Sequence, residues 1–285
     1  FYTNLYILIT ATSGGGKDYP LNFPYQLFSE AECKDIIGGS PESDSGILTG
    51  LDKQQSRLDK FDEASRLFVM MNDEKNSYAS KMGDVYAELY SSPGRHYSGK
   101  TLKAGKIGEC FSPCVSLFCA LTIDDFKKNF NITLISKGIG ARFLFFPDME
   151  YKDIIQPDNS PIPLELLQFV KDARNSIRTN TVNFSKGIEP FKMKMTDNVK
   201  SKFLSITNEF RKIGSTKDLL SPIYNRLGEN MIKLAIIDAV SINKETLTLD
   251  SLDWSYSWMK AQVNSLDAFL EENLLGSKYQ MISNV

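Results

Sequence analysis

Histidine and cysteine are scarce in this chain, and their scarcity excludes several kinds of active site. Among 285 residues there is a single histidine, His96, which removes most Ser-His-Asp and Cys-His catalytic schemes. No acidic residue adjoins His96 in the sequence, so we expect it to be a surface residue. The cysteines lack the paired C-x2-C spacing of a zinc site, and we expect reduced thiols packed in a core. They are Cys33, Cys110, Cys114 and Cys119.

Long apolar runs and a strong net charge are also absent. No apolar run approaches the ~20 residues that cross a bilayer, so we expect no membrane partner. The formal net charge is −2, so binding to nucleic acid would need a local basic patch. The sequence begins at Phe1, and Leu5–Ile9 is too short for a signal peptide and lacks its basic flank. We interpret the start as a cut through a longer chain and expect an upstream domain.

The first half of the chain alternates between strand and helix patterns. Residues 4–11 are mostly apolar and include β-branched Ile7, Ile9 and Thr10, which predicts a buried strand. The same reasoning predicts further strands at 57–61, 115–121 and 141–146, and helices at 21–37, 45–55, 64–90 and 123–130. This order favours an α/β fold with a mostly parallel sheet.

In the second half, strand patterns almost vanish. Helices are predicted at 164–178, 196–212, 217–242 and 249–274. Thr248 suits the cap of the last helix, which contains Trp254 and Trp258. The expected domains are a core at 1–155 and an all-helical C-terminal domain at 156–285.

The first predicted strand leads directly into a glycine-rich turn, residues 11–18, with the sequence Ala-Thr-Ser-Gly-Gly-Gly-Lys-Asp. In the P-loop pattern G-x-x-x-x-G-K-[ST], backbone N–H groups close around phosphate oxygens, and the lysine reaches the β and γ phosphates. The final hydroxyl holds magnesium. We expect ATP and Mg²⁺ here, bound by Ser13, Gly14, Gly15, Gly16, Lys17 and Asp18.

Two positions of this turn depart from the pattern. Ala11 replaces the first glycine, a change that many P-loops tolerate, and Asp18 replaces the usual Ser or Thr. A carboxylate can ligate magnesium, but it adds negative charge beside the phosphates. Three outcomes stay open: slow catalysis, a differently held metal, or nucleotide binding without turnover. The alternative is a glycine-rich turn with no ligand.

A second stretch, residues 94–101, matches the P-loop letters fully as Gly-Arg-His-Tyr-Ser-Gly-Lys-Thr. It follows a predicted helix and the turn at 91–93, not a buried strand. A glycine at 105 stands where the phosphate-binding helix should begin. Because the motif depends on a strand before it and a helix after it, we prefer the loop at 11–18.

Acidic and polar residues follow two later strands. Asp62 and Glu63 come after the strand at 57–61, and we expect the first to hold magnesium and the second to polarise the attacking water. The alternative is a solvated helix start, where acids are favoured. Thr122 ends the strand at 115–121 and is a candidate sensor of the γ-phosphate, with capping of the next helix as the alternative.

One arginine stands at the start of a strongly apolar strand. Arg142 precedes Phe143-Leu144-Phe145-Phe146 and is a candidate for neutralising charge in the transition state, in its own subunit or in a neighbour. The alternative is a salt bridge at a sheet edge.

The order of these motifs resembles the helicase-like P-loop ATPases of bacteriophages and mobile elements. The matching residues are 13–17, 62–63, 117–122 and 138–145. The resemblance covers residues 3–150 and extends more faintly to 225–235. It implies a RecA-like core, ring-shaped homo-oligomers such as hexamers, ATP and Mg²⁺, and action on single-stranded DNA during replication. It also implies a primase-polymerase partner or domain, and the cytoplasm of a bacterial host cell.

Within this resemblance, four residues match motif positions, and one departs. Lys17, Asp62, Glu63 and Arg142 match, whereas Asp18 replaces a hydroxyl, which puts the handling of the metal in question. DNA contact would use the basic loop at 91–109, with one aromatic side chain placed to stack on a base. The expected DNA-binding residues are Arg95, Tyr97, Lys100, Lys103 and Lys106. The alternative is an ordinary solvated basic loop.

The leading hypothesis is therefore an oligomeric ATP-dependent motor on DNA, such as a replicative helicase. A DNA-packaging or loader ATPase would share every motif named above. A nucleotide-binding scaffold without turnover is the alternative from a different class, and Asp18 is the feature that favours it. A nucleotide or nucleoside kinase is a third option, but the arginine-rich lid of such enzymes is not evident.

Overall fold

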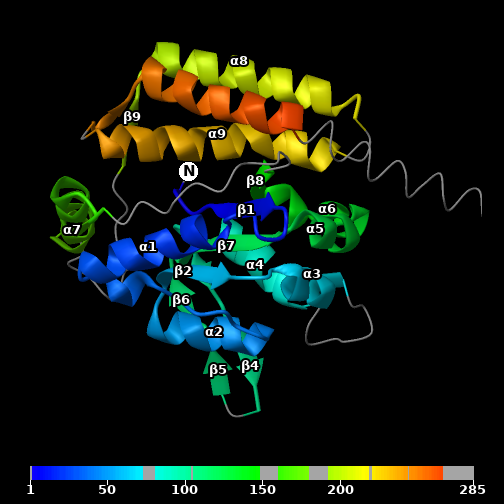
Figure 1. Ribbon diagram of the computed structural model, residues 1–285. Helices are drawn as coiled ribbons and strands as arrows, with labels where there is room; N and C mark the ends of the chain where they lie inside the picture. Colours follow the sequence, from blue (N-terminus) through cyan, green and yellow to red (C-terminus); the bar gives the residue numbers. More distant parts are fainter. Residues whose placement is uncertain are drawn as a thin grey trace, which may run out of the picture.

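A four-stranded, wholly parallel sheet lies at the centre of the first half of the chain (Figure 1). The computed structural model describes residues 2–72, 81–103, 105–147, 160–179, 192–217, 220–242 and 244–265. In the sheet the strands follow the order β2-β7-β1-β8. Their bounds are β1 Tyr6–Ala11, β2 Ser56–Phe61, β7 Cys114–Thr122 and β8 Phe143–Pro147. The predicted α/β class, the parallel sheet and all four strands are confirmed.

Both faces of this sheet are covered by helices, which explains why its strands read as nearly continuous apolar runs. α3 (Ser65–Asn72), α4 (Lys81–Ser91), α5 (Ile123–Asn129) and α6 (Ile132–Ser136) contact one another on one face, and α2 (Asp44–Lys53) contacts α4 there. Phenylalanine rings from β8 pack edge-on against rings of α3 and α5 on this face. The right-handed crossover from β1 to β2 places α1 (Asp18–Glu30) on the opposite face, where it contacts α7 (Leu164–Thr179).

Several boundaries differ from those predicted. The helix predicted at 21–37 begins earlier, at Asp18, and ends at Glu30. The single helix predicted at 64–90 is two helices, α3 and α4, separated by residues 73–80, which lie outside the described part of the chain. The 3-10 turn η1 (Lys34–Ile36) leads to Ile37, which pairs in parallel with Leu58 on the outer side of β2.

The basic loop at 91–109 is also more ordered than predicted. It contains the short antiparallel pairs β3–β6 and β4–β5. Their bounds are β3 His96–Tyr97, β4 Lys100–Leu102, β5 Gly105–Ile107 and β6 Cys110–Phe111. The β4–β5 hairpin projects beyond α2 on the β2 side of the molecule (Figure 1). Because β7 follows at Cys114, this loop enters the sheet at the amino ends of its strands.

Three helices form a layer over the β8 side of the sheet (Figure 1). They are α8 (Asp197–Gly214), α9 (Ser221–Ser241) and a helix that runs from residue 249 to residue 265, where the described part ends. The helices predicted at 164–178, 196–212 and 217–242 are confirmed, and the one predicted at 249–274 is confirmed as far as residue 265. A two-residue parallel pair, β9 (Lys194–Met195) with β10 (Thr246–Leu247), joins this layer at one end.

The helical layer and the sheet share one continuous cluster of buried apolar side chains. A polar network crosses the same boundary near the amino end of β1. The Nζ of Lys233 in α9 donates to the carbonyl and side-chain oxygens of Asn4 at 3.1 and 3.2 Å, and it lies 3.5 Å from the ring centre of Tyr90. The Tyr90 hydroxyl donates to Asn230 at 2.6 Å. The expected domain boundary at residue 155 lies outside the described residues, but the two parts are packed together.

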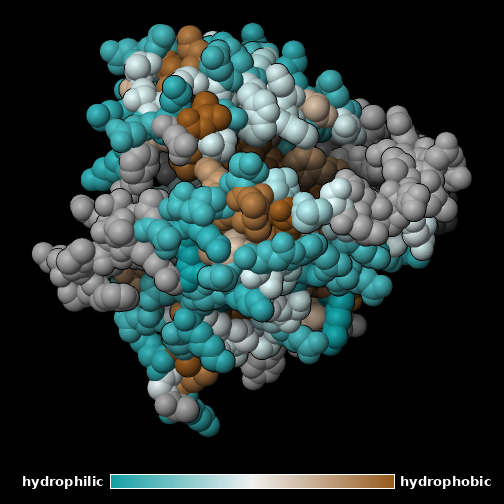
Figure 2. Space-filling model, turned by 60° about the vertical axis from the view of Figure 1, so that its left-hand side comes forward, coloured by the Kyte–Doolittle hydropathy of each residue, from teal (hydrophilic) through white to brown (hydrophobic). Residues whose placement is uncertain are grey.

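In Figure 2 the visible face is mostly hydrophilic, with apolar side chains in separate patches. Within the described ranges, no helix is long and apolar enough to cross a membrane.

The buried Lys233 makes stability depend on pH. Burial lowers the pKa of Lys233 to about 8, while neighbouring Glu229 opposes this shift. An unfolded lysine titrates near ~10.4, so between the two pKa values the unfolded chain holds one more proton than the folded chain, and stability rises with pH. The test compares wild type with Lys233→Met, which cannot titrate at this position. The difference between their free energies of unfolding, wild type minus variant, should rise between pH 8 and ~10, by up to about 1.4 kcal/mol per pH unit.

Urea titrations at a series of pH values measure this difference. Subtraction removes the titration of the other groups, which both proteins share. A difference that stays flat above pH 8 would show that Lys233 is charged in the folded state at those pH values.

Candidate functional site at the carboxyl edge of the sheet

The glycine-rich loop and the acidic residues lie at the same edge of the sheet. β1 ends at Ala11, which is the register partner of Thr122 at the end of β7, and β2 ends at Phe61, opposite Cys119. From β1 the chain continues toward β2, whereas from β7 it continues toward β8. In open parallel sheets, ligands bind outside the carboxyl ends of strands at such a reversal of direction. This edge is therefore the candidate site.

The glycine-rich loop, residues 12–17, joins β1 to α1 and needs its glycines for two reasons. Gly14 and Gly16 have φ values of 75° and 78°, in the left-handed region that side chains with a Cβ avoid. Gly15 donates its N–H to the carbonyl of Thr12 at 2.9 Å, and a Cβ on Gly15 would lie 2.9 Å from the Thr12 hydroxyl. A Cβ on Gly14 or Gly16 would meet no atom within 4 Å. The loop is thus tight toward the protein and open on its outer side.

Lys17 and Asp18 stand where this loop enters α1. Lys17 occupies the N-cap position of the 13-residue helix and is half-buried, and Asp18 is the first helical residue and is exposed. The free N–H groups and the dipole of a helix N-terminus attract anions. Neither side chain forms an ion pair with any other described residue, so the charge of Lys17 is free for a ligand. Loop, lysine and helix together fit a phosphate group.

The acidic turn, residues 62–64, follows β2 with an unusual backbone. Glu63 has a φ of 58°, a left-handed conformation that costs a non-glycine residue roughly 1–2 kcal/mol. The turn is held against β7 by the N–H of Ala64, which donates to the carbonyl of Ala120 at 2.8 Å. Asp62 and Glu63 are both exposed. Strain of this kind concentrates at functional sites, because there the direction of a side chain matters more than local stability.

Only β7 separates the acidic turn from the strand that carries the glycine-rich loop. Neighbouring strands lie ~4.8 Å apart, so β2 lies about 10 Å from β1 across the sheet. Phe61 pairs with Cys119, three residues before the partner of Ala11, so β2 also ends about 10 Å earlier along the strand direction. The last residues of the two strands are therefore about 14 Å apart.

Thr122 caps α5, which is the alternative role that the sequence left open. Its hydroxyl accepts from the N–H of Asp125 at 3.1 Å and donates to the Asp125 carboxylate at 2.9 Å, which makes Thr122 the cap of α5. Its proton is therefore already engaged, and the expected role as a sensor that donates to a γ-phosphate has no support from this geometry.

The expectation for Arg142 is wrong for its own subunit. Arg142 ends the 3-10 turn η2 (Gly140–Arg142) before β8, so it lies at the amino edge, a strand length of about 15–20 Å from the glycine-rich loop. Its Nη1 donates to the Gly138 carbonyl at 2.6 Å, and its guanidinium lies 5.6 Å from the ring centre of Tyr90. Half-buried in these contacts, Arg142 is a packing residue at the boundary with α9, and a role in a neighbouring subunit is disfavoured too.

The second P-loop-like stretch, residues 94–101, has the wrong surroundings, as predicted. It forms β3 and the start of β4, and no helix follows it. Lys100 donates to the carboxylate of Asp44 at 2.5 Å. Burial alone would raise the pKa of Asp44, but the hydrogen bonds from Lys100 and from the N–H of Ser45 lower it below its ordinary value. Lys100 is therefore a structural partner of a buried carboxylate.

Three of the five expected DNA-binding residues, Lys100, Tyr97 and Lys106, make contacts with acidic side chains. Tyr97 is buried, and its hydroxyl donates to Glu88 at 3.3 Å, so the expectation that Tyr97 stacks on a base is wrong. Lys106 is exposed and pairs with Glu109 at 2.7 Å, and Arg95 and Lys103 are exposed. His96 is exposed as expected, although Glu109 also lies 3.1 Å from it.

The cysteines and the acidic residues do not form a preassembled metal site. All four cysteines are free thiols, and three of them are buried. In the part of the chain that the structure describes, no group of three or more His, Cys, Asp or Glu side chains could hold a metal ion. Mg²⁺ fits the site without such a cage, because it keeps several waters and takes one or two carboxylates together with phosphate oxygens. Asp62 and Asp18 are the residues placed to supply them.

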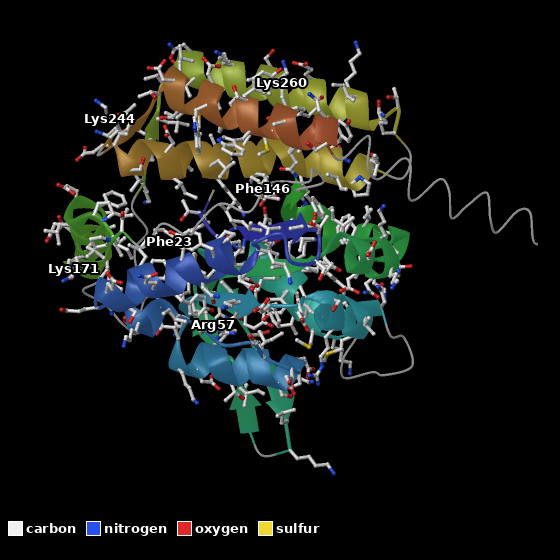
Figure 3. The ribbon with its side chains drawn as sticks, viewed as in Figure 1. Phe23, Arg57, Phe146, Lys171, Lys244 and Lys260 are labelled. Carbon is white, nitrogen blue, oxygen red and sulfur yellow. The ribbon has the colours of Figure 1, made fainter. Side chains whose placement is uncertain are left out.

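Sequence reasoning missed two features. The polar pattern of β2 comes from a buried ion pair, in which Arg57 donates to Asp59 at 2.8 Å beside the hydroxyl of Tyr86 (Figure 3). Alternation along the strand puts Arg57 and Asp59 on one face, which was the available signal. Trp254 and Trp258, to which the sequence analysis assigned no role, are 43% exposed, and Trp258 contacts Phe146 at this edge of the sheet.

No family model matches this chain, and no curated protein matches it.

Replacing the two acids by glycine should have opposite effects on stability. Glu63→Gly removes the strain of a left-handed φ, so the free energy of unfolding should rise by about 0.5–1 kcal/mol after allowance for the extra freedom of the unfolded chain. Asp62 has no positive φ, so Asp62→Gly should lower it by about 0.5–1 kcal/mol. Urea unfolding of both variants measures this. Equal losses in the two proteins would mean that Glu63 is not strained.

Proposed function

We propose that this chain binds ATP with Mg²⁺ at the glycine-rich loop and hydrolyses it to drive movement along single-stranded DNA. The observation that carries the proposal is the shared edge of the sheet. A tight, outward-open glycine loop with an unpaired Lys17 faces two exposed carboxylates, one of them on a strained backbone, across a single strand. Hydrolysis of a phosphate chain uses a loop that binds the phosphates, an acid that holds the metal and a residue that orients the attacking water.

Each residue of the edge has a distinct task in the proposed reaction. The N–H groups of residues 13–17 and the amine of Lys17 bind the phosphate oxygens and offset their charge. Asp62, with Asp18, holds the metal, and Mg²⁺ supplies charge neutralisation to the terminal phosphates when bound. Glu63 orients the attacking water and accepts its proton. Thr122 and Arg142 have no part in this scheme, because the Thr122 hydroxyl caps α5 and Arg142 lies at the opposite edge of the sheet.

The strand order supports a RecA-like core. The strand that carries the glycine-rich loop is internal, the strand that carries the acids lies one strand away, and Ile37 adds a short parallel pairing on the outer side of β2. This gives the order Ile37-β2-β7-β1-β8, with every pairing parallel. The sequence resemblance to phage-type helicases rests on the same loop and acids and is consistent with this order.

The proposed action on DNA and the proposed assembly into a hexameric ring both rest on that resemblance. The exposed basic side chains of Arg95, Lys103 and Lys106 also support action on DNA. A primase-polymerase domain or partner, and the cytoplasm of a bacterial host, are proposed on the resemblance alone. The competing function is a nucleotide-binding scaffold, or a packaging or loader ATPase, with weak or no turnover. Asp18 favours it, because an exposed carboxylate occupies the place of the metal-binding hydroxyl.

Two lysine variants test which loop binds the nucleotide. Lys17→Ala should abolish ATP binding and Mg²⁺-dependent hydrolysis, since it removes the positive charge at the N-cap of α1. Lys100→Ala should leave ATP affinity unchanged, although loss of the partner of buried Asp44 will destabilise the fold. Calorimetric titration with ATP, at a temperature where both proteins are folded, decides the question. Loss of binding in Lys100→Ala alone would move the site to residues 94–101.

The basic loop is tested by the salt dependence of DNA binding. The double variant Arg95→Ala/Lys103→Ala should bind single-stranded oligonucleotides more weakly, with the slope of log affinity against log salt reduced by about 1.4 for two lost phosphate contacts. The stimulation of ATP hydrolysis by DNA should fall together with the affinity for DNA. Tyr97→Phe is the control and should bind DNA as wild type does, because its ring is buried. An unchanged slope in the double variant would exclude this loop as the DNA site.

A further inference from the structure

Three aromatic side chains gather beside the candidate site on the β8 side. Phe146 belongs to β8, and its ring lies 5.6 Å from that of Trp258, which lies 6.2 Å from that of Trp254. Both tryptophans come from the helix that runs from residue 249. We refer to Phe146, Trp254 and Trp258 as the aromatic cluster. Phe146 lies where the sheet meets the helical layer (Figure 3).

The two tryptophans are not needed to pack their own helix. Its buried stripe is formed by Ser251, Leu252, Ser255, Met259 and Gln262. Trp254 and Trp258, four residues apart, lie on the outward stripe, and each is 43% exposed. Large aromatic side chains left half-exposed on the outer stripe of an amphipathic helix are candidates for contact with a ligand.

The register of the sheet places the aromatic cluster next to the glycine-rich loop. Phe146 pairs with Ile9, two residues before the end of β1, and β8 is the immediate neighbour of β1. Adjacent strands are ~4.8 Å apart, so the cluster begins one strand away from the loop.

The positions of the acids decide how a bound nucleotide is oriented. Asp62 and Glu63 lie on the β2 side of the glycine-rich loop, and the aromatic cluster lies on the β8 side. The terminal phosphate must point toward the acids, because hydrolysis takes place there. The nucleoside end therefore extends in the opposite direction, over the end of β8. A nucleobase in that position has an aromatic surface to stack on.

We infer that Trp258, supported by Phe146 and Trp254, is the platform on which the base of the nucleoside triphosphate stacks. This inference rests on the proposed function, and it makes the helical layer part of the nucleotide site. Stacking is available to every base, so the platform contributes affinity for the nucleoside independently of the phosphates. It would also couple nucleotide occupancy to the position of the last helix.

A comparison of ATP with inorganic tripolyphosphate, which has the phosphates but no base, tests the platform. Trp258→Leu should weaken ATP binding about tenfold and leave tripolyphosphate binding unchanged, and Trp258→Phe should recover part of the ATP affinity. Lys17→Ala should lose both ligands. Trp254 and Trp258 are the only tryptophans in the chain, so fluorescence reports on this site alone. ATP, and not tripolyphosphate, should quench the fluorescence of wild type.

Phe111→Leu is the matched control, because Phe111 is a 39% exposed aromatic residue at the amino edge of the sheet, and it should bind both ligands as wild type does. Equal ATP affinity in wild type and Trp258→Leu would overturn the platform and leave the glycine-rich loop in place. Loss of both ligands in both Trp258 variants would also overturn it, because a base platform spares a ligand without a base. If wild type binds neither ligand, the proposed function fails, and the platform fails with it.

Discussion

The parallel register of β1 with its two neighbours is the constraint on which the rest of the structure depends. It sets Ala11 beside Thr122 and Thr10 beside Pro147, so three strands end at one edge. Every group discussed as a candidate ligand leaves the sheet at that edge. A shift of one residue in β1 would exchange its two faces and move Leu8, which is fully buried, to the half-buried face of Ile7 and Ile9. The burial of the strand therefore fixes the position of the glycine-rich loop.

Charged side chains differ in burial and in pairing between the two edges of the sheet. At the amino edge and inside the sheet, charged groups are buried and paired: Arg57 with Asp59, and Lys233 with Asn4 and Glu229. Desolvation raises the pKa of Asp59 despite the pairing with Arg57, so these groups serve packing and specificity. At the carboxyl edge, Asp18, Asp62 and Glu63 are exposed, Lys17 is half-buried, and none of the four forms an ion pair with another described residue. Charge left unpaired beside a strained backbone is what a binding site requires.

The strands and helices were predictable because each depends on the local pattern of apolar and polar residues. Alternation and apolar runs identified all four strands of the sheet, and helical spacing identified the helices of the second half. The contact partners of individual side chains were not predictable, because they depend on neighbours far apart in the sequence. Arg142 stacks on Tyr90, and Tyr97 reaches Glu88, across a boundary that no local pattern reveals. Lys100 is paired with Asp44, 56 residues away.

The sequence by itself determined the glycine-rich loop between a buried strand and a helix, because strand, glycines and helix start are contiguous and each depends on short-range sterics. It also determined which of two P-loop-like stretches has the right surroundings. The tertiary structure alone decided that the acidic turn stands across one strand from that loop, that Arg142 belongs to the opposite edge, and that two tryptophans from the last helix lie beside the site. The physical reason is that strand order and helix docking are set by long-range burial, which brings together residues that no sequence spacing connects.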